Sequence, residues 1–148
     1  MTTLSALGIE AEVREFDEST ATAEAAAAAI GTSVERIVKS LVFATPDGHP
    51  VLTLVSGANR VDLGKLSAAV GHPVARANAN QVRQATGFAI GGVPPVGHQE
   101  KLPVYVDADL LQYDQVWAAA GTPKSVFAIA PDDLVRVAGG QVLSLKAE

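Results

Sequence analysis

Two apolar runs near the middle of the chain predict a pair of neighbouring strands. Residues 38–44 and 50–55 are mostly apolar, and both runs are short enough to be strands rather than helices. The PDGH sequence between them supplies Pro, Asp and Gly, which favour a tight turn. Because both faces of each run are apolar, we expect these strands to lie at the centre of a sheet.

Three further segments combine capping residues with helical patterns. The run TATAEAAAAAIG is rich in alanine, whose small side chain implies close packing against a neighbouring element. In each segment a Thr, Asp or Asn can accept from the first-turn amides, and a Gly can end the helix in a left-handed conformation. The expected helices run from Thr20 or Thr22 to Gly31, over 63–70 between Asp62 and Gly71, and from Asn78 or Asn80 to Gly87.

The remaining segments predict short strands and a last helix. Strands and helices do not alternate in regular βαβ units. We therefore expect one α+β domain over residues 1–148, built on a mixed sheet of six or seven strands. Pro131 and the two acids after it open a helix over DDLVRVAG. The other expected elements are strands around 74–76, over 103–107, 115–120 and 125–130 and at VLSLK, a polar helical turn after 107, and a turn at GTPK.

Composition narrows the classes of function. The chain has 148 residues, no Cys and three scattered His, so thiol chemistry is excluded and a structural zinc site is not expected. No apolar run approaches the length of a membrane span, and the N-terminus lacks a basic flank. We therefore expect a soluble, cytoplasmic protein with no metal, no cofactor and no membrane association.

Charge is distributed unevenly along the sequence. The net charge is -5, yet residues 60–101 hold five basic residues against two acidic ones. Scattered basic residues are typical of an ordinary solvated surface, but this middle third is also the one candidate for a surface that faces phosphates. Its basic residues, which we take as candidate tRNA-binding residues below, are Arg60, Lys65, Arg76, Arg83 and Lys101.

A single lysine interrupts the first central strand. In strict alternation Lys39 shares one face with Leu41 and Phe43, and the opposite face, which includes Ser40, is otherwise apolar. The lysine can extend its ammonium group into solvent along its aliphatic stem. If the amine instead stays among apolar side chains, it must lose its charge or bind a partner. A phosphate or carbonyl group of a ligand would be such a partner.

The glycine- and proline-rich segment GGVPPVG, residues 91–97, is a second candidate for chemistry. Its glycines permit close approach of the backbone to a ligand, and Pro94 and Pro95 stiffen it, so that its N–H or C=O groups can point in fixed directions. It is neither a dinucleotide-binding nor a P-loop fingerprint, and a plain connection is the alternative. No serine stands in a nucleophile motif, and His98 is either a general base or an exposed loop imidazole.

Other chemically capable residues have structural explanations. Asp107, Asp109 and Asp114 are carboxylates of the kind used in acid–base catalysis, but their places at a strand end and a helix start account for them. Trp117 and Phe127 fall in strands and are expected in the core.

Three motifs occur in a characteristic order: TAEAAAAAIG followed by ERIVKSLVF, then GGVPPVGH, then AAGTPKSVFAIAPDDLV. In this order the chain resembles the YbaK/ProX family, the single-domain aminoacyl-tRNA deacylases related to the editing domain inserted in bacterial prolyl-tRNA synthetases. An alanine-rich helix that leads shortly to a Lys-Ser/Thr pair at a strand start is that family's signature. Gly91, Pro95 and Gly97 fit its G-x-x-x-P-x-G loop. The resemblance covers most of the chain.

The resemblance implies a barrel-like mixed sheet with helices packed around it and a pocket for the 3′ end of a mischarged tRNA. It implies hydrolysis of the ester between the amino acid and the terminal ribose, with catalytic roles for Lys39, Gly91 and Gly92. Lys39 would anchor the substrate, the glycine loop would orient the scissile group, and water or a substrate group would attack. The implied partners are the acceptor end of the mischarged tRNA and a synthetase that delivers it. The candidate substrate-binding residues are Thr22, Ser40, Pro95, Gly97, His98 and Gly121.

One turn departs from the family pattern. Many members carry Gly-Gly and a small or polar residue before the C-terminal strand, whereas this chain reads AGTPK at 120–124. That turn borders the amino-acid pocket in the family, so alanine, cysteine, serine and threonine esters all remain open as substrates. Two other functions also remain open: a non-catalytic module of the same fold that binds tRNA or a synthetase, and a hydrolase of small acyl esters that uses no RNA.

Overall fold

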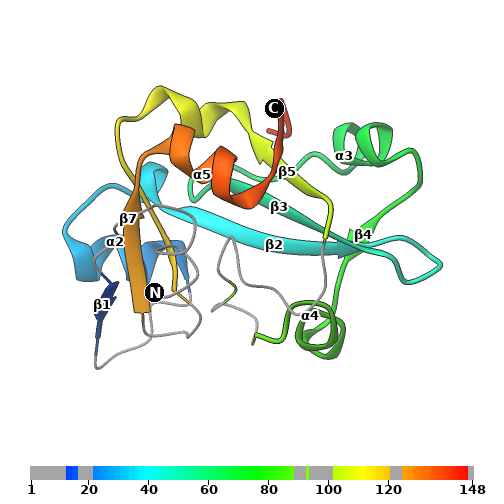
Figure 1. The fold of residues 1–148 in the computed structure, drawn as a ribbon, viewed down its shortest axis with the longest axis horizontal. Coiled ribbons are helices and arrows are strands. Elements are labelled where there is room, and N and C mark those ends of the chain that lie inside the picture. The colour runs from blue at the N-terminus through cyan, green and yellow to red at the C-terminus, as the bar shows by residue number, and fades with distance from the viewer. Residues whose placement is uncertain (1–12, 17–21, 89–92, 94–101, 121–124, 147–148) are drawn as a thin grey trace.

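A computed structural model describes residues 13–16, 22–88, 93, 102–120 and 125–146. Within these ranges the chain is a mixed α+β fold in which helices surround two sheets (Figure 1). None of the helices in the described ranges combines the length and the hydropathy of a membrane span. The helices are α2 (Ala23–Ile30), α3 (Leu63–Val70), α4 (Ala79–Thr86) and α5 (Pro131–Ala138), with 3-10 turns η1 (Val34–Arg36) and η2 (Ala108–Gln112).

The strands form a five-stranded and a three-stranded sheet. In the larger sheet, of order β4-β2-β3-β5-β8, β2 is antiparallel to β3 and β4, whereas β3, β5 and β8 are parallel. The smaller sheet, of order β1-β7-β6, is antiparallel. The strands are β1 (Val13–Glu15), β2 (Val38–Ala44), β3 (Pro50–Ser56), β4 (Ala75–Arg76), β5 (Val104–Asp107), β6 (Val116–Ala119), β7 (Ser125–Ile129) and β8 (Gln141–Leu143).

The arrangement differs in part from the expected one. The mixed α+β class is confirmed, and β2 and β3 are central strands of their sheet, as their apolar faces predict. In place of one barrel-like sheet of six or seven strands, however, the described residues form eight strands in two sheets, and these ranges show no closed barrel. Among the described residues the sheets meet at a single parallel bridge between Ile37 and Trp117, and β4 pairs with the far end of β2.

The expected caps account for both ends of three helices. Backbone amides of Ala25, Lys65 and Gln81 donate to the side chains of Thr22, Asp62 and Asn78 at 3.1, 3.0 and 2.9 Å. Gly31, Gly71 and Gly87 end these helices with φ of 85, 86 and 82°, a left-handed conformation that glycine adopts without strain. Asn78 also forms a capping box with Gln81.

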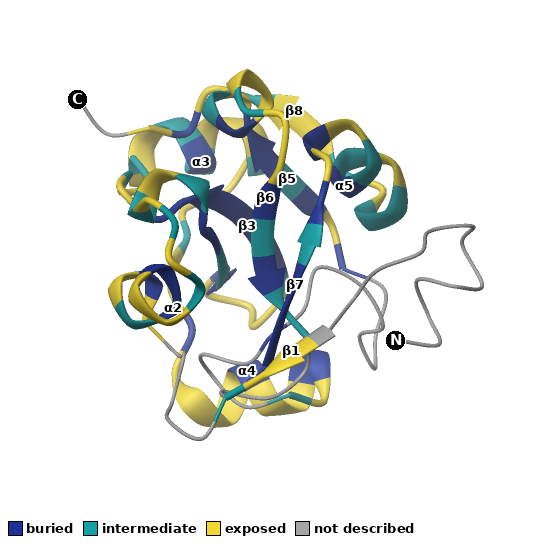
Figure 2. Ribbon diagram, turned by 90° about the vertical axis from the view of Figure 1, so that its left-hand side faces the viewer, coloured by how far each residue is buried: buried dark blue, intermediate teal, exposed yellow. Residues whose placement is uncertain are grey.

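The inner strands β2, β3 and β5 of the larger sheet pack on both faces, whereas β4 and β8 at its ends are largely exposed (Figure 2 shows β3 and β8). Residues such as Val42 and Leu52 face the main core, which α4, α5 and the smaller sheet complete. Alternate residues such as Phe43 and Val51 face a second cluster with Leu66 of α3. This alternation agrees with the two faces expected for β2. Phe127 is fully buried, as expected, whereas Trp117 is only half-buried.

Helix α2 packs closely on the turn that follows β3. Its buried face consists of alanines, among them Ala23, and forms a third cluster with Ile37. A Cβ atom added to Gly57 would lie 2.5 Å from the carbonyl oxygen of Val34 and 2.8 Å from the Cβ atom of Ala23. The small side chains therefore set the distance between α2 and the sheet.

Replacing Gly57 by Ala should lower the free energy of unfolding by about 1–3 kcal/mol, because backbone atoms, which cannot rotate away, occupy the space needed. Urea denaturation of the two proteins measures the change. The matched control is Gly64→Ala in α3, where the added Cβ would meet only a carboxylate oxygen of Asp62 at 3.1 Å and helix propensity favours Ala by roughly 1 kcal/mol. Equal stability of Gly57→Ala and the parent protein would contradict this packing.

Candidate active site

A cavity of about 440 Å³ lies beside the first half of β2, between α2 and β6. Its volume is within the range of small-molecule sites. The polar side chains that line it are Thr22, Glu24, Lys39, Ser40 and Arg76. The other lining residues are apolar or glycine: Ala23, Ala26, Ile37, Val38, Leu41, Gly57, Val93, Trp117, Ala118, Ala119 and Val126.

The cavity exists because the two sheets separate at this point. Along the outer edge of β2, β4 pairs with Phe43 and Ala44, and β6 meets the edge at the bridge between Ile37 and Trp117. Between these contacts, residues 38–41 have no strand partner on this edge within the described ranges. A ligand in the cavity can therefore reach backbone as well as side-chain groups of β2.

Ser40 presents several hydrogen-bonding groups to this gap. Gly57 N–H donates to the carbonyl of Ile37, and Ala77 N–H donates to that of Val42 from the opposite side. Because an antiparallel strand alternates its bonding direction, the backbone N–H and C=O of Ser40 point away from β3, toward the gap. The Oγ atom of Ser40 is buried and has no hydrogen-bond partner among the described residues. A buried hydroxyl without a partner is costly, and a polar ligand would satisfy it.

Lys39 is half-buried in the wall of the same cavity. Its Nζ atom donates to the backbone carbonyl oxygen of Asn59. Burial lowers the pKa of Lys39 below its ordinary value; Glu24 partly offsets this effect, and the positive charges of Arg60 and Arg76 add to it. The amine is thus bound to a backbone carbonyl while its side chain lines the cavity, and its environment disfavours the positive charge.

Trp117 forms part of the cavity wall, which its assignment to the core did not anticipate. The residue is half-buried and packs against the alanine face of α2. The guanidinium carbon of Arg14 lies 4.8 Å from the ring centroid, so a cation covers the indole. The only signal for this position in the sequence is the presence of a single Trp, a side chain that often lies between apolar and polar surroundings.

The structure brings some of the expected site residues together. Thr22, Lys39, Ser40 and Arg76 all line the cavity, although the hydroxyl of Thr22 is also the N-cap of α2. Arg60 is exposed but close enough to affect the pKa of Lys39. Lys65 and Arg83 do not line this cavity: Lys65 donates to the backbone oxygen of Lys146, and Arg83 is exposed in the last turn of α4. Gly91, Gly92, Pro95, Gly97, His98, Lys101 and Gly121 lie outside the described residues.

One residue of the predicted glycine loop is described. Val93 is 2% exposed, belongs to the main core and lines the cavity opposite β2. Val93, the described residue of this segment, therefore lies beside the cavity. A second cavity of about 440 Å³, near His49, His72 and Tyr105, has no buried unpaired polar atom among its described lining residues. The two cavities are equal in volume, but only the first has a buried polar atom without a partner, the Oγ atom of Ser40, among its described lining residues.

Comparisons with known proteins agree on one family. The family model described as aminoacyl-tRNA editing domain matches residues 17–137. The uncharacterized protein YwhH of Bacillus subtilis is 35% identical over 84% of this chain and 80% of its own length. EbsC of Enterococcus faecalis, named as a candidate Cys-tRNA(Pro)/Cys-tRNA(Cys) deacylase, is 28% identical over 85% of this chain and 77% of its own length. A crystal structure described as a candidate trans-editing enzyme for prolyl tRNA synthetase superposes with a TM-score of 0.93, at 49% identity, over 99% of this chain and 94% of that one.

The titration of Lys39 tests the electrostatics of the cavity. Replacing Glu24 by Gln removes a negative charge that favours the ammonium form, so the pKa of Lys39 should fall further below its ordinary value. Replacing Arg76 by Gln removes a repelling positive charge, so the pKa should rise. Nuclear magnetic resonance of labelled lysine side chains measures both. Glu35→Gln, which changes a carboxylate that does not influence Lys39, is the control; a parent pKa at the ordinary lysine value would refute the described environment.

Proposed function

Because this chain belongs to the aminoacyl-tRNA editing domain family, we propose that it is a trans-editing hydrolase that deacylates mischarged tRNA. The proposal draws support from the names of two similar proteins, one a candidate deacylase and the other a candidate trans-editing enzyme. It also draws support from the cavity beside β2, where a lysine and an unpaired hydroxyl meet an otherwise apolar wall.

The observation that carries the proposal is the half-buried Lys39 in the cavity wall, with its amine bound to a neutral carbonyl. An ammonium group has three N–H donors, and the carbonyl of Asn59 accepts from one of them. The two others and the positive charge remain for a ligand. The ester carbonyl of an aminoacyl-tRNA, or the phosphate next to its terminal adenosine, matches this requirement.

The reaction needs positioning more than a side-chain nucleophile. Water adds to the ester carbonyl carbon, and the carbonyl oxygen takes up negative charge, which Lys39 stabilises through hydrogen bonding and charge. The bond from this carbon to the ribose oxygen then breaks, and the ribose oxygen receives a proton to restore the hydroxyl group. The free amino acid and the uncharged tRNA leave. The backbone and hydroxyl of Ser40 are placed to orient the bound acyl group.

The described lining residues hold no activated nucleophile. Thr22 and Ser40 are the hydroxyl residues of the wall, and neither is hydrogen-bonded to a His or a carboxylate within the described ranges. A serine or threonine hydroxyl without an adjacent base is a weak nucleophile. We therefore assign the attack to water, which a hydroxyl of the terminal ribose can orient, with the substrate held by Lys39 and by the loop that contains Gly91 and Gly92.

The walls of the cavity favour a small amino acid. Alanines contribute from α2 and from β6, and Trp117 limits the space between these elements. Esters of alanine, cysteine, serine and threonine are the proposed substrates. An apolar wall separates side chains that differ by one methylene by only about 1–3 kcal/mol, so a single enzyme of this kind can accept more than one of them.

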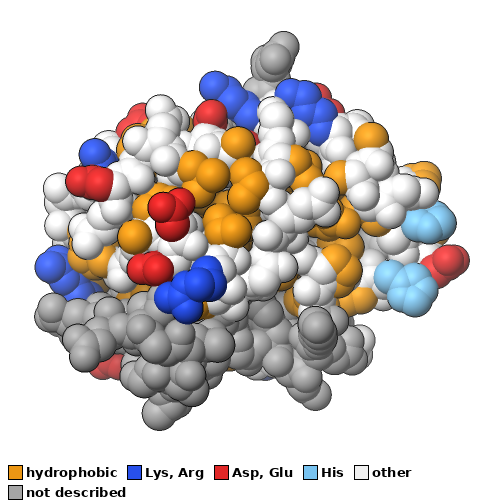
Figure 3. Space-filling view, turned by 45° about the horizontal axis from the view of Figure 1, so that its top comes forward, with side chains coloured by type: hydrophobic (Ala, Val, Ile, Leu, Met, Phe, Trp, Pro, Cys, Tyr) orange, Lys and Arg blue, Asp and Glu red, His pale blue; other side chains and the backbone are white. Residues whose placement is uncertain are grey.

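Phosphate contacts outside the cavity would be few and sensitive to salt. On the face shown in Figure 3, basic side chains stand in separate groups among acidic ones rather than in a continuous strip. Of the candidate tRNA-binding residues, Arg76 lines the cavity, and Arg60 influences its lysine. We propose that the acceptor end of the tRNA enters past these two residues and that a synthetase partner helps to deliver it.

Replacing Lys39 by Ala should lower kcat for deacylation of mischarged tRNA by roughly 10²–10³-fold, because the charge that stabilises the developing oxyanion is lost. Single-turnover hydrolysis of Ala-, Cys-, Ser- and Thr-charged tRNA measures the effect. Arg36→Ala is the control, since Arg36 also carries a positive charge but pairs with Asp114 at 2.9 Å and does not line the cavity.

Three outcomes would contradict the proposal in different ways. If the parent protein hydrolyses none of these substrates, the chain is not a deacylase for them, and a non-catalytic module becomes the better description. If Lys39→Ala is as active as Arg36→Ala, hydrolysis occurs without the proposed anchor. Hydrolysis of free amino acid esters at the same rate as the charged tRNA would favour a small-ester hydrolase.

The double change Arg76→Ala, Arg83→Ala should raise KM for charged tRNA, most strongly at low salt, while kcat at saturation changes little. The reason is that phosphate contacts contribute binding that added salt weakens, and each lost contact lowers the slope of log affinity against log salt by about 0.7–0.9. Deacylation at several salt concentrations measures both constants. An unchanged KM at every salt concentration would exclude these two residues from tRNA binding.

A further inference from the structure

The carbonyl group that binds Lys39 belongs to a turn rather than to a strand. Asn59 follows β3, and its N–H donates to the carbonyl of Ser56 at 2.9 Å. The hydroxyl of Ser56 donates to the carbonyl of Glu35 at 2.8 Å, which ties the start of this turn to η1. These bonds fix the near end of the turn. The orientation of the Asn59 peptide then depends on what holds its side chain.

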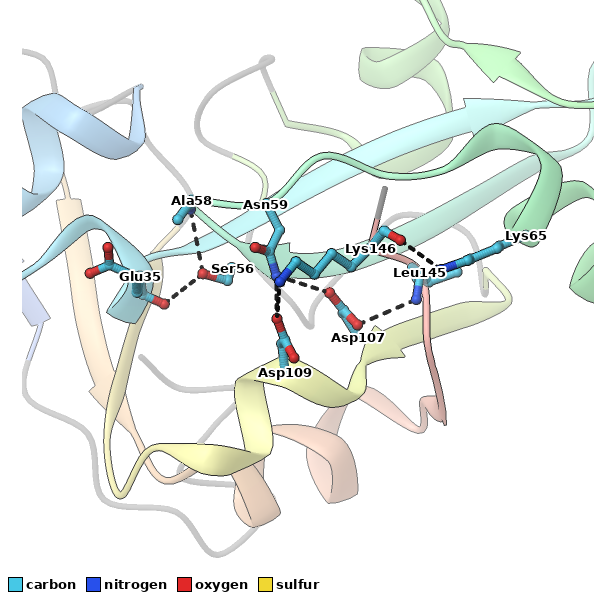
Figure 4. A network of polar contacts seen from close by, with 9 residues as sticks. All are labelled: Glu35, Ser56, Ala58, Asn59, Lys65, Asp107, Asp109, Leu145 and Lys146. Atoms are coloured by element: carbon cyan, nitrogen blue, oxygen red, sulfur yellow. Dashed lines mark hydrogen bonds and ion pairs between the residues drawn. The ribbon is translucent and has the colours of Figure 1, made fainter. Parts of the chain in front are cut away.

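The side chain of Asn59 is bound to two carboxylates from the end of β5 and from η2 (Figure 4). Its Nδ2 atom donates to Oδ2 of Asp109 at 2.8 Å and lies 3.4 Å from Oδ2 of Asp107. Asp107 is 1% exposed, and its other oxygen accepts from the backbone N–H of Leu145 at 3.3 Å. One amide side chain thus joins the turn after β3, the end of β5 and, through Asp107, the C-terminal segment.

The burial of Asp107 is costly, and no cation pairs with it among the described residues. Its hydrogen bonds come from an amide side chain and a backbone N–H. These neutral donors hold the carboxylate of Asp107 in place without an ion pair. The exposed ion pair between Lys146 and Asp109, at 3.7 Å, contributes little by comparison.

We propose that Asn59 is a positioning residue for Lys39, and that Asp107 and Asp109 hold the Asn59 side chain so that its backbone carbonyl aims the ammonium group along the cavity wall. A neutral carbonyl binds the amine without cancelling its charge, whereas a carboxylate at the same place would form an ion pair and compete with an anionic ligand. The effect on deacylation rests on the function proposed above; the effect on the position of the amine does not.

Acylation of the lysine amines tests the position of Lys39 directly. The parent protein and Asn59→Ala are treated with an amine-reactive acetylating ester, and the rate at each lysine is followed by peptide mass spectrometry. In Asn59→Ala the rate at Lys39 should rise roughly tenfold, the change expected when a hydrogen bond to a charged group is lost. The rates at Lys65 and Lys146 should stay within about twofold, since a single released hydrogen bond does not loosen the whole domain.

Asn78→Ala is the matched control for stability. It also replaces Asn by Ala and costs roughly 1 kcal/mol through loss of the α4 cap, but Asn78 lies outside the cavity lining. Asp109→Asn keeps an acceptor for the Asn59 amide and should behave as the parent, whereas Asp109→Ala should raise the rate at Lys39. Because Asp109 is partly exposed, these two variants keep the test decisive if Asn59→Ala does not fold.

Deacylation provides the second measurement. Asn59→Ala and Asp109→Ala should lower kcat by roughly tenfold with little change in KM, whereas Asp109→Asn should keep the kcat of the parent. This pattern is expected when the amine of Lys39 loses its orientation but no contact that binds the substrate is removed. Equal labelling of Lys39 in Asn59→Ala and Asn78→Ala would overturn the proposal, whatever the kinetics. Faster labelling in a protein that deacylates nothing would support the positioning role and reject the proposed function.

Discussion

A positive charge in a central strand that is otherwise mostly apolar on both faces constrains the whole site. Lys39 is half-buried, and among the described residues its amine is bound by the backbone carbonyl of Asn59 rather than by a carboxylate. A neutral acceptor stabilises the ammonium form less than an ion pair would, and burial lowers the pKa of this lysine. The charge of the ammonium group is therefore not neutralised by its partner in the protein. For this reason it can interact strongly with an oxygen atom of a ligand.

The cavity follows from the way the two sheets meet. A continuous barrel would pair the outer edge of β2 along its full length, and its backbone groups near Ser40 would be used in that pairing. The single bridge at Ile37 leaves the edge open, and α2 covers the opening from the side. The alanines of α2 and Gly57 have small side chains or none, so α2 can pack close to the end of β3. The same packing that stabilises the fold thus limits the width of the site.

Local chemistry in the sequence predicts the elements well and the site in part. Thr22, Asp62 and Asn78 act within three residues of their own positions, so sequence alone reveals them. Lys39 stands out because a charge in an apolar run is unexpected. The support for Lys39 could not be predicted, since Asn59 and the carboxylates that hold it are 48 and 50 residues apart and each is an ordinary polar residue in its own segment. The open edge of β2 depends on sheet topology, which local patterns do not determine.

The charges around Lys39 also couple binding to protonation. The positive charges of Arg60 and Arg76 disfavour the ammonium form of Lys39, and the negative charge of Glu24 favours it. Among the described residues Glu24 forms no hydrogen bond with the amine, so it acts through its charge. An anionic group that enters the cavity acts in the same direction as Glu24 and raises the pKa of Lys39. By linkage, an amine that gains a proton more readily with the anion bound must bind the anion more tightly when protonated. Alkaline pH therefore weakens the affinity of this cavity for anions, and burial, together with the two arginines, moves that loss to lower pH than an isolated lysine would show.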